Sequence, residues 1–319
     1  MTQIVAITLN PSIDISTSVD RLMPMRKLRC AAPRMFPGGG GVNVARVAVR
    51  LGADVQLIYP SGGASGQLLR RMIDREGIPN LAIDLVEETR EDFTVLEETT
   101  GAEYRFVLPG PLFSESEWRQ CLSAIENLSI HSTFVVASGS LPPGVPTDLY
   151  AQIARIAKRG GGKFVLDTSG EPLEAALKEG VYLLKPNLRE LNELIRSDLE
   201  DDESLVAACR KLIAENAAEI VALTLGDFGA LLVTRDGVWR AQAPKVNFVS
   251  AVGAGDSFLG ALLWGLASER TMPEALRYAV AAGAAAVLTP GTALCDRDDV
   301  ERLAPDVKVE AFAVRQDAG

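Results

Sequence analysis

Short runs of apolar residues alternate with amphipathic segments along most of the chain. The runs at 134–137, 164–167, 182–185 and 220–224 have the length of buried strands, and segments such as 188–196 between them have helical spacing. Strands that are covered on both faces are continuously apolar, because neither face meets water. The pattern therefore predicts an α/β protein with a mainly parallel sheet and helices on both of its faces.

Two other stretches, 12–34 and 89–109, alternate polar with apolar residues, which is typical of exposed strands. We expect them to form a small separate β-sheet of four or five strands. Lys27 and Arg29 alternate with apolar neighbours, so a strand would place both side chains on one side of this sheet. That side is either a solvated edge or a binding surface. The α/β domain is expected to comprise the remaining residues, 1–11, 35–88 and 110–319.

Composition and charge narrow the classes of function. The 319 residues carry a formal net charge of −10, which argues against a nucleic-acid partner. The four cysteines lie far apart without a metal-binding pair, which fits the reducing cytoplasm. The N-terminus lacks the features of a signal peptide, and the uncharged stretch 278–295 is too rich in alanine and glycine for a membrane span, so no membrane partner is expected. His131 is the sole histidine and is expected at the surface, which disfavours a Ser-His-Asp hydrolase.

The stretch 247–264 contains the clearest chemical signal. An extended segment ends in the small-residue turn Gly253, Ala254 and Gly255, and an apolar run that predicts a buried helix begins at Ser257. The N–H groups of such a turn and the positive end of the helix dipole together favour an anion. Asp256 lies inside this anion site, where a carboxylate is useful for accepting a proton during phosphoryl transfer. The alternative is that Asp256 only caps the helix.

A run of four glycines, 38–41, precedes a predicted helix at 42–51. Neither a complete G-x-G-x-x-G motif nor a Walker A sequence is present, which disfavours a dinucleotide fold and a P-loop kinase. The glycines favour a sugar that lies against bare backbone at Gly39, with hydrogen bonds from Asn43.

Two further positions allow more than one interpretation. Asn187 and Glu190 have the spacing of a capping box at the start of a predicted helix, which explains both residues without a role in chemistry. Arg90 carries a guanidinium that is suited to bidentate phosphate binding. Asp92, two residues later, weakens any role of position 92 in binding an anion.

These motifs resemble those of the ribokinase-like sugar kinases, the PfkB family. Residues 252–258, VGAGDSF, match the C-terminal signature of that family, and residues 37–45, PGGGGVNVA, match its N-terminal signature. The resemblance covers nearly the whole chain and implies a ribokinase-like fold with the small sheet as a lid over the sugar. It also implies a kinase dependent on ATP and Mg²⁺, most similar to the branch that phosphorylates the 1-hydroxyl of fructose 6-phosphate.

The resemblance also implies a role for each matching residue. Asp256 is the expected base, and the backbone of Gly253, Ala254 and Gly255 steadies the transferring group. The residues expected to contact the sugar phosphate are Asp14, Lys27, Gly39, Asn43, Arg90 and Ser138. The residues expected on the nucleotide side are Lys185, Asn187, Thr224, Gly226 and Gly229. The expected metal-linked residues are Glu190 for Mg²⁺ through water, and Ser250, Val252, Ala286 and Gly291 for a monovalent cation such as K⁺.

A homodimer formed through the lid is also implied, and three alternatives stay open. Relatives that act as 1-phosphofructokinase or tagatose-6-phosphate kinase commonly have Lys where this chain has Gly40. A nucleoside or ribose kinase is disfavoured by the basic residues of the lid. A non-catalytic sugar-phosphate-binding protein is disfavoured because Asp256 and its turn are both retained.

Overall fold

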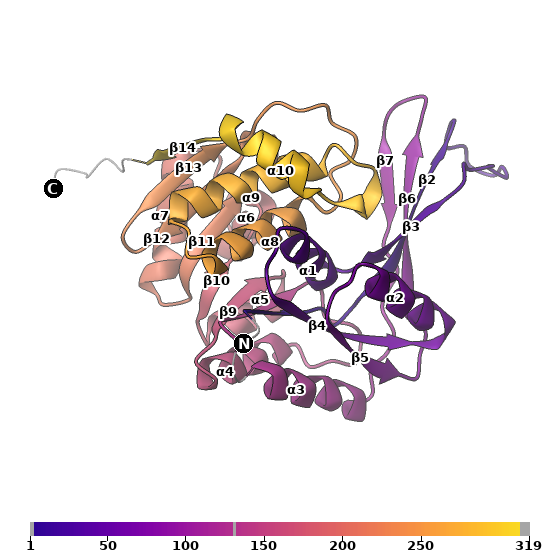
Figure 1. Ribbon diagram of the computed structural model, residues 1–319, viewed down its shortest axis with the longest axis horizontal. Coiled ribbons are helices and arrows are strands. Elements are labelled where there is room, and N and C mark those ends of the chain that lie inside the picture. Colours follow the sequence, from indigo (N-terminus) through magenta and orange to yellow (C-terminus); the bar gives the residue numbers. More distant parts are fainter. Residues whose placement is uncertain (1–2, 130–131, 313–319) are drawn as a thin grey trace.

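The computed structural model describes residues 3–129 and 132–312, so His131 falls outside the described range. A ten-stranded sheet forms the body, in the order β14-β13-β12-β11-β10-β9-β8-β1-β4-β5 (Figure 1). From β11 to β5 in this order, neighbouring strands are parallel. Strands β12, β13 and β14 at the opposite edge each pair antiparallel with their neighbours. The strands are β1 (Ile4–Ile7), β4 (Val55–Gly62), β5 (Asn80–Leu85), β8 (Phe134–Ser138), β9 (Lys163–Asp167), β10 (Val181–Leu184), β11 (Ala218–Thr224), β12 (Ala230–Thr234), β13 (Val238–Gln242) and β14 (Lys308–Ala311).

Helices cover both faces of the large sheet and bury two separate apolar cores. Alternate residues of β1 show why: Ile4 and Ala6 belong to one core, and Val5 and Ile7 to the other. One face carries α1 (Gly40–Arg50), α2 (Gly63–Arg75), α8 (Ala254–Ala267), α9 (Met272–Ala286) and α10 (Arg297–Leu303). The other carries α3 (Glu115–Ser129), α4 (Leu149–Arg159), α5 (Glu171–Leu177), α6 (Leu188–Ile195) and α7 (Asp202–Ala214). The predicted architecture is confirmed.

Across the described part of the chain, no helix combines the length and the apolar character needed to cross a membrane. The uncharged stretch 278–295 instead contributes to α9 and to the loop that follows it. Alanine residues of α9 are buried against α8, where small side chains permit a close approach of the two helices.

A second sheet of four strands stands beside the body (Figure 1). Its order is β3-β2-β6-β7, with β2 and β6 parallel and the outer pairs antiparallel. The last two strands form an antiparallel hairpin. Because β3 pairs with β2, residues 34–38 join the small sheet, while the division of the chain into two domains stays a prediction. The strands are β2 (Ser12–Val19), β3 (Arg34–Gly38), β6 (Arg90–Glu97) and β7 (Glu103–Phe106).

The strand expected around Lys27 is wrong. Residues 20–33 contain no strand, and a turn lies at Pro24 and Met25. Proline lacks an N–H group for a ladder, and Met25 has a positive φ of 59°, which interrupts an extended chain. The segment returns along β2 instead, where the amide of Ala31 donates to the carbonyl of Ser18 at 2.9 Å.

A buried guanidinium on α1 joins this helix to three other parts of the fold. Arg46 is 1% exposed, and its Nη2 lies 2.7 Å from Oε1 of Glu76 at the end of α2. Its Nη1 donates to the carbonyls of Pro37 at 3.2 Å and Thr292 at 2.8 Å. Arg50 shares the Glu76 carboxylate at 3.0 Å. The Arg46 guanidinium, held by Glu76, therefore positions β3 and the turn at 291–293 against α1.

We expect Arg46→Met to lower the free energy of unfolding by about 3 kcal/mol, because removal of one partner strands buried polar groups of the other elements. Urea denaturation measures the change. The control is Arg302→Met, which breaks an exposed ion pair with Asp299 and should cost less than about 1 kcal/mol. Equal losses in the two variants would contradict a structural role for the buried pair.

Candidate active site

A cleft of about 310 Å³ opens where the small sheet meets the carboxyl ends of the central strands. Helix N-termini, strand ends and the small sheet each contribute to its wall. The predicted site residues that line the cleft are Asp14, Gly39, Asn43, Arg90, Lys185, Glu190, Val252, Gly253, Gly255 and Asp256. Ser138 lines an adjoining cavity that shares Gly40, Arg90, Asp167, Glu190 and Asp256 with this cleft.

The turn before α8 supplies backbone N–H groups to the cleft. Gly253 has a φ of 78°, and a Cβ there would lie 2.5 Å from the side chain of Leu294, so a larger residue is excluded on two grounds. Helix α8 begins at Ala254, three residues earlier than predicted, which places Asp256 in its first turn. The first N–H groups of a helix have no partner within the helix and carry partial positive charge, so they favour an anion.

The carboxylate of Asp256 is held by a residue more than two hundred positions away. Asn43 on α1 donates from Nδ2 to Oδ2 of Asp256 at 2.9 Å. Burial, and after it the charge of Asp167, raise the pKa of Asp256 to about 6 against the opposing effects of Asn43 and Lys185. A carboxyl group with that pKa is ionised at neutral pH and is a stronger proton acceptor than an ordinary aspartate.

Lys185 brings a positive charge to the same point. Its side chain is 5% exposed, and its Nζ lies 3.0 Å from Oδ1 of Asp167 at the end of β9. Burial disfavours its charged form, but Asp167, Glu190 and Asp256 together raise the pKa of Lys185, so it stays protonated. A Cβ at Gly255 would lie 3.5 Å from Nζ, which shows that the ammonium group faces the turn. Lys185 and the turn thus converge on one anion position.

The glycine run brings α1 close to the sheet. Gly39 has a φ of 104°, which favours glycine, and a side chain at Gly40 would run into the hydroxyl of Ser138. The same hydroxyl donates to Asp167 at 3.1 Å. Bare backbone at 39–40 therefore borders the cleft, as the sequence predicted for a sugar site.

The capping box that the sequence predicted is confirmed. The amide of Glu190 donates to Oδ1 of Asn187 at 2.9 Å, and the amide of Asn187 donates to Oε2 of Glu190 at 2.9 Å. Glu190 nevertheless lines the cleft. Thr224 forms a β-bridge with Asn187, which sets the turn at Gly226–Phe228 beside the start of α6. Gly229 follows with a φ of 97°.

The residues expected at a monovalent cation lie on two joined segments. Ser250 and Val252 precede the turn, Ala286 is the last residue of α9, and Gly291 lies in the loop after it. The amide of Val249 donates to the carbonyl of Val287 at 2.8 Å, which connects the two segments. The Ser250 hydroxyl donates to Glu103 of β7 at 2.8 Å, so the small sheet also contacts this region.

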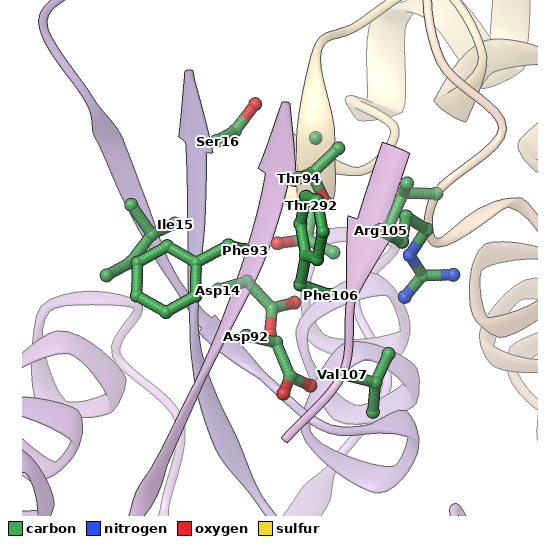
Figure 2. A pocket seen from close by; sticks show the side chains of 12 residues that line it. Asp14, Ile15, Ser16, Asp92, Phe93, Thr94, Arg105, Phe106, Val107 and Thr292 are labelled. Atoms are coloured by element: carbon green, nitrogen blue, oxygen red, sulfur yellow. The ribbon is translucent and has the colours of Figure 1, made fainter. Parts of the chain in front are cut away.

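The small sheet contributes both acidic and basic side chains to the cleft. Asp14 and Asp92 are register partners on β2 and β6, and Figure 2 shows their carboxylates next to each other in the pocket below Thr292. Arg90 lies 2.9 Å from Asp92. Burial raises the pKa of Asp92 and Asp14 adds to this, while Arg90 opposes it. Arg105 on β7 also lines the cleft.

Sequence reasoning missed some residues of the site and misplaced another. Asp167 and Arg105 line the cleft but lie outside the recognised motifs; the end of a buried strand was the signal available for Asp167. Lys27 is exposed and is not among the residues that line this cleft. The expected contact of Lys27 with a substrate phosphate therefore has no support within one protomer.

The fold and the cleft define a ribokinase-like sugar kinase. The model of the pfkB family carbohydrate kinases matches residues 1–299, and the chain belongs to this family. It is 44% identical over 315 residues to the ATP-dependent 6-phosphofructokinase isozyme 2 of Mycobacterium tuberculosis, which covers 99% of this chain and 92% of the relative. It is 39% identical over 305 residues to the isozyme 2 of Escherichia coli, which covers 95% and 98%.

Solved structures agree with this assignment. The crystal structure of the Escherichia coli phosphofructokinase-2 in complex with fructose 6-phosphate superposes with a TM-score of 0.90 at 37% identity, and covers 96% of this chain and 99% of that one. A structure of the same enzyme in complex with potassium gives a TM-score of 0.91 at 38% identity, with the same shares covered.

We expect Glu190→Gln to separate capping from chemistry. Gln also serves a capping box, so the free energy of unfolding should change by less than about 0.5 kcal/mol. A metal-linked role predicts a fall in kcat of roughly tenfold or more at limiting Mg²⁺, the size of loss typical for residues that support a metal indirectly. Normal kinetics at limiting Mg²⁺ would leave only the capping role, and Glu190→Ala provides the comparison that loses the cap.

Proposed function

We propose that the chain transfers the γ-phosphoryl group of ATP to the 1-hydroxyl of fructose 6-phosphate and yields fructose 1,6-bisphosphate. The observation that carries this proposal is the placement of Asp256 in the first turn of α8, beside Lys185 and held by Asn43. A proton acceptor and an anion site thus lie within one turn of helix. The names of the two curated relatives support this substrate.

Proton acceptance and charge stabilisation are assigned to different groups of the site. The Asn43 hydrogen bond occupies Oδ2 of Asp256, which leaves Oδ1 to accept the proton of the sugar hydroxyl. The N–H groups of the turn at 253–255 and the ammonium of Lys185 stabilise negative charge that develops on the transferring group. The partly buried position of Asp256 strengthens these interactions, because less water screens them.

The residues of the cleft also fit the nucleotide. The missing Cβ of Gly255 leaves space between Lys185 and the helix N-terminus, where a phosphate group fits. ATP supplies the phosphoryl group when bound, and Asn187, Thr224, Gly226 and Gly229, which lie beside the start of α6, would contact it. Glu190 would support Mg²⁺ through water, with Oε1 directed away from the cap. The segments 250–252 and 286–291 would hold K⁺, as the potassium complex of the Escherichia coli relative suggests.

A second candidate is a 1-phosphofructokinase or tagatose-6-phosphate kinase, since relatives of this kind match at about 30% identity. Gly40 favours the first proposal, because relatives of the second kind commonly have a lysine at this position. A coupled assay of ADP release with fructose 6-phosphate, fructose 1-phosphate, tagatose 6-phosphate, ribose and fructose tests both. A higher kcat/KM for any sugar other than fructose 6-phosphate would overturn the proposal.

We expect Asp256→Asn to lower kcat by about 10²–10⁴, the usual contribution of a general base, with the KM for ATP nearly unchanged. The variant keeps the size of the side chain and can still accept the Asn43 hydrogen bond. In the wild type, kcat/KM should fall as the pH drops below about 6, because the protonated carboxyl accepts no proton. A variant that keeps more than roughly a tenth of wild-type kcat would contradict the general-base role.

The same substitution gives a readout that is independent of activity. Folding raises the pKa of Asp256 above its unfolded value, so the ionised carboxylate weakens the fold at neutral pH, and this weakening diminishes as the pH falls below about 6. Asp256→Asn should therefore be more stable than the wild type at pH 7.5, with a smaller difference at pH 5. Urea denaturation at the two pH values checks the sign.

We also propose that the chain acts as a cytoplasmic homodimer, joined through the small sheet. An apolar row crosses all four strands through the register partners Met35, Ile15, Phe93 and Phe106. Its two end residues, Met35 and Phe106, are 47% and 51% exposed. Exposed apolar side chains on one sheet favour burial against a second copy. The Escherichia coli relative has a described tetrameric form, which shows that this relative associates.

We expect Phe106→Glu to convert the dimer to a monomer, because an unpaired carboxylate would be buried at the interface. Sedimentation velocity measures the change. Glu98→Gln, in the exposed turn between β6 and β7, provides the control and should stay dimeric. A wild-type chain that sediments as a monomer, or a variant that stays dimeric, would exclude this interface.

A further inference from the structure

The small sheet presents two carboxylates where the proposed substrate carries its phosphate. Asp14 and Asp92 are register partners of the parallel strands β2 and β6, so their side chains leave the sheet on the same face. Both line the cleft, and Figure 2 shows their carboxylates together at the base of the pocket below Thr292. Like charges directly opposite each other weaken a sheet, so this pair has a cost that calls for a functional reason.

Asp92 forms an ion pair with Arg90, whose guanidinium was expected to bind phosphate. Asp92 contacts Nη1 of Arg90 through both oxygens, at 2.9 and 3.2 Å. Asp92 is itself held, because Oδ1 accepts from the amide of Leu108 at 3.0 Å. The remaining bonds of Arg90 go to main-chain carbonyls of Leu108 and Asn10, each at 3.1 Å. Nε of Arg90 is buried and has no hydrogen-bond partner within the described residues.

Formal charge explains what this arrangement does to an anion. At the end of the cleft formed by the small sheet, the charged residues are Asp14, Asp92, Arg90 and Arg105, and their charges cancel. A sugar phosphate carries close to two negative charges at neutral pH, so it meets no net attraction there. Neutralising Asp92 would leave a net charge of +1 and would release the Nη1 edge of Arg90.

We propose that Asp92 is a specificity-determining residue, which competes with the phosphate of the substrate for Arg90 and thereby weakens the binding of phosphorylated sugars. The inference rests on the proposed function, since it assigns the small-sheet end of the cleft to the phosphate. Phosphate binding replaces one charge-assisted contact of Arg90 with another, so its net gain is smaller than with a free guanidinium.

The test is Asp92→Asn, which keeps the acceptor for the Leu108 amide and removes one charge. We expect the KM for fructose 6-phosphate to fall by about five- to twentyfold, the range expected when a charge-assisted contact becomes available, while the KM for ATP stays unchanged. Isothermal titration should show the same gain in affinity for fructose 6-phosphate and none for fructose. Glu98→Gln is the matched control: it removes one negative charge from the exposed turn between β6 and β7 and should change neither constant.

The pairing with Arg90 is tested in a double-mutant cycle. Arg90→Ala alone should raise the KM for fructose 6-phosphate roughly tenfold or more. Asp92→Asn in the Arg90→Ala background should lower this KM less than it does in the wild type, since the competition needs the guanidinium and only the repulsion between the carboxylate and the phosphate is then relieved. A KM that is unchanged or raised in Asp92→Asn alone would overturn the inference and would assign Asp92 to a sugar hydroxyl instead.

The two proposals fail in different ways. If the wild type turns over fructose 6-phosphate but Asp92→Asn does not bind it more tightly, the proposed function stands and the role of Asp92 is wrong. If fructose 6-phosphate is not a substrate but Asp92→Asn tightens its binding in the titration, the role of Asp92 stands and the proposed function is wrong.

Discussion

The hydrogen bond from Asn43 to Asp256 is the contact on which the rest of the site depends. It joins the first turns of α1 and α8, two helices that pack side by side on one face of the sheet. Each helix begins in a glycine turn that no larger residue fits, so both N-termini approach the same point. Arg46, one turn after Asn43, secures α1 to the turn at 291–293, against which Gly253 packs. The carboxylate that we propose as the base is thus positioned by buried structure.

Several acidic side chains surround the anion position between Lys185 and the turn at 253–255. Their mutual repulsion lowers the stability of the fold. Asp256 has a raised pKa because burial and Asp167 both disfavour its charge. Lys185 compensates in part, since it lies between Asp167 and the turn. Buried acids with raised pKa values lower the stability of a fold, and they are typical of active sites. The capping box differs, because Asn187 and Glu190 stabilise α6 while Glu190 also lines the cleft.

Sequence patterns predicted the fold class, both glycine turns, the capping box and Asp256, because each depends on local spacing. Asp167 and Arg105 were missed, since their place in the cleft follows from strand order and pairing rather than from a local motif. The strand around Lys27 was wrong because alternation alone cannot reveal the positive φ of Met25 that follows Pro24. Helix α3, helix α7 and the strands β5, β13 and β14 were not predicted, since their polar faces obscure the apolar spacing.

The pairing register of the small sheet decides which of its faces carries charge. Along β2 and β6, the acidic partners Asp14 and Asp92 precede the apolar partners Ile15 and Phe93 by one residue. Successive residues of a strand point to opposite faces, so a slip of one residue on either strand would set an acid opposite an apolar side chain. The hydroxyl of Ser12 donates to Asp14 at 2.6 Å, and Gly38 leaves room for this carboxylate, since a Cβ there would run into it. The glycine run therefore serves the small sheet as well as the helix that it begins.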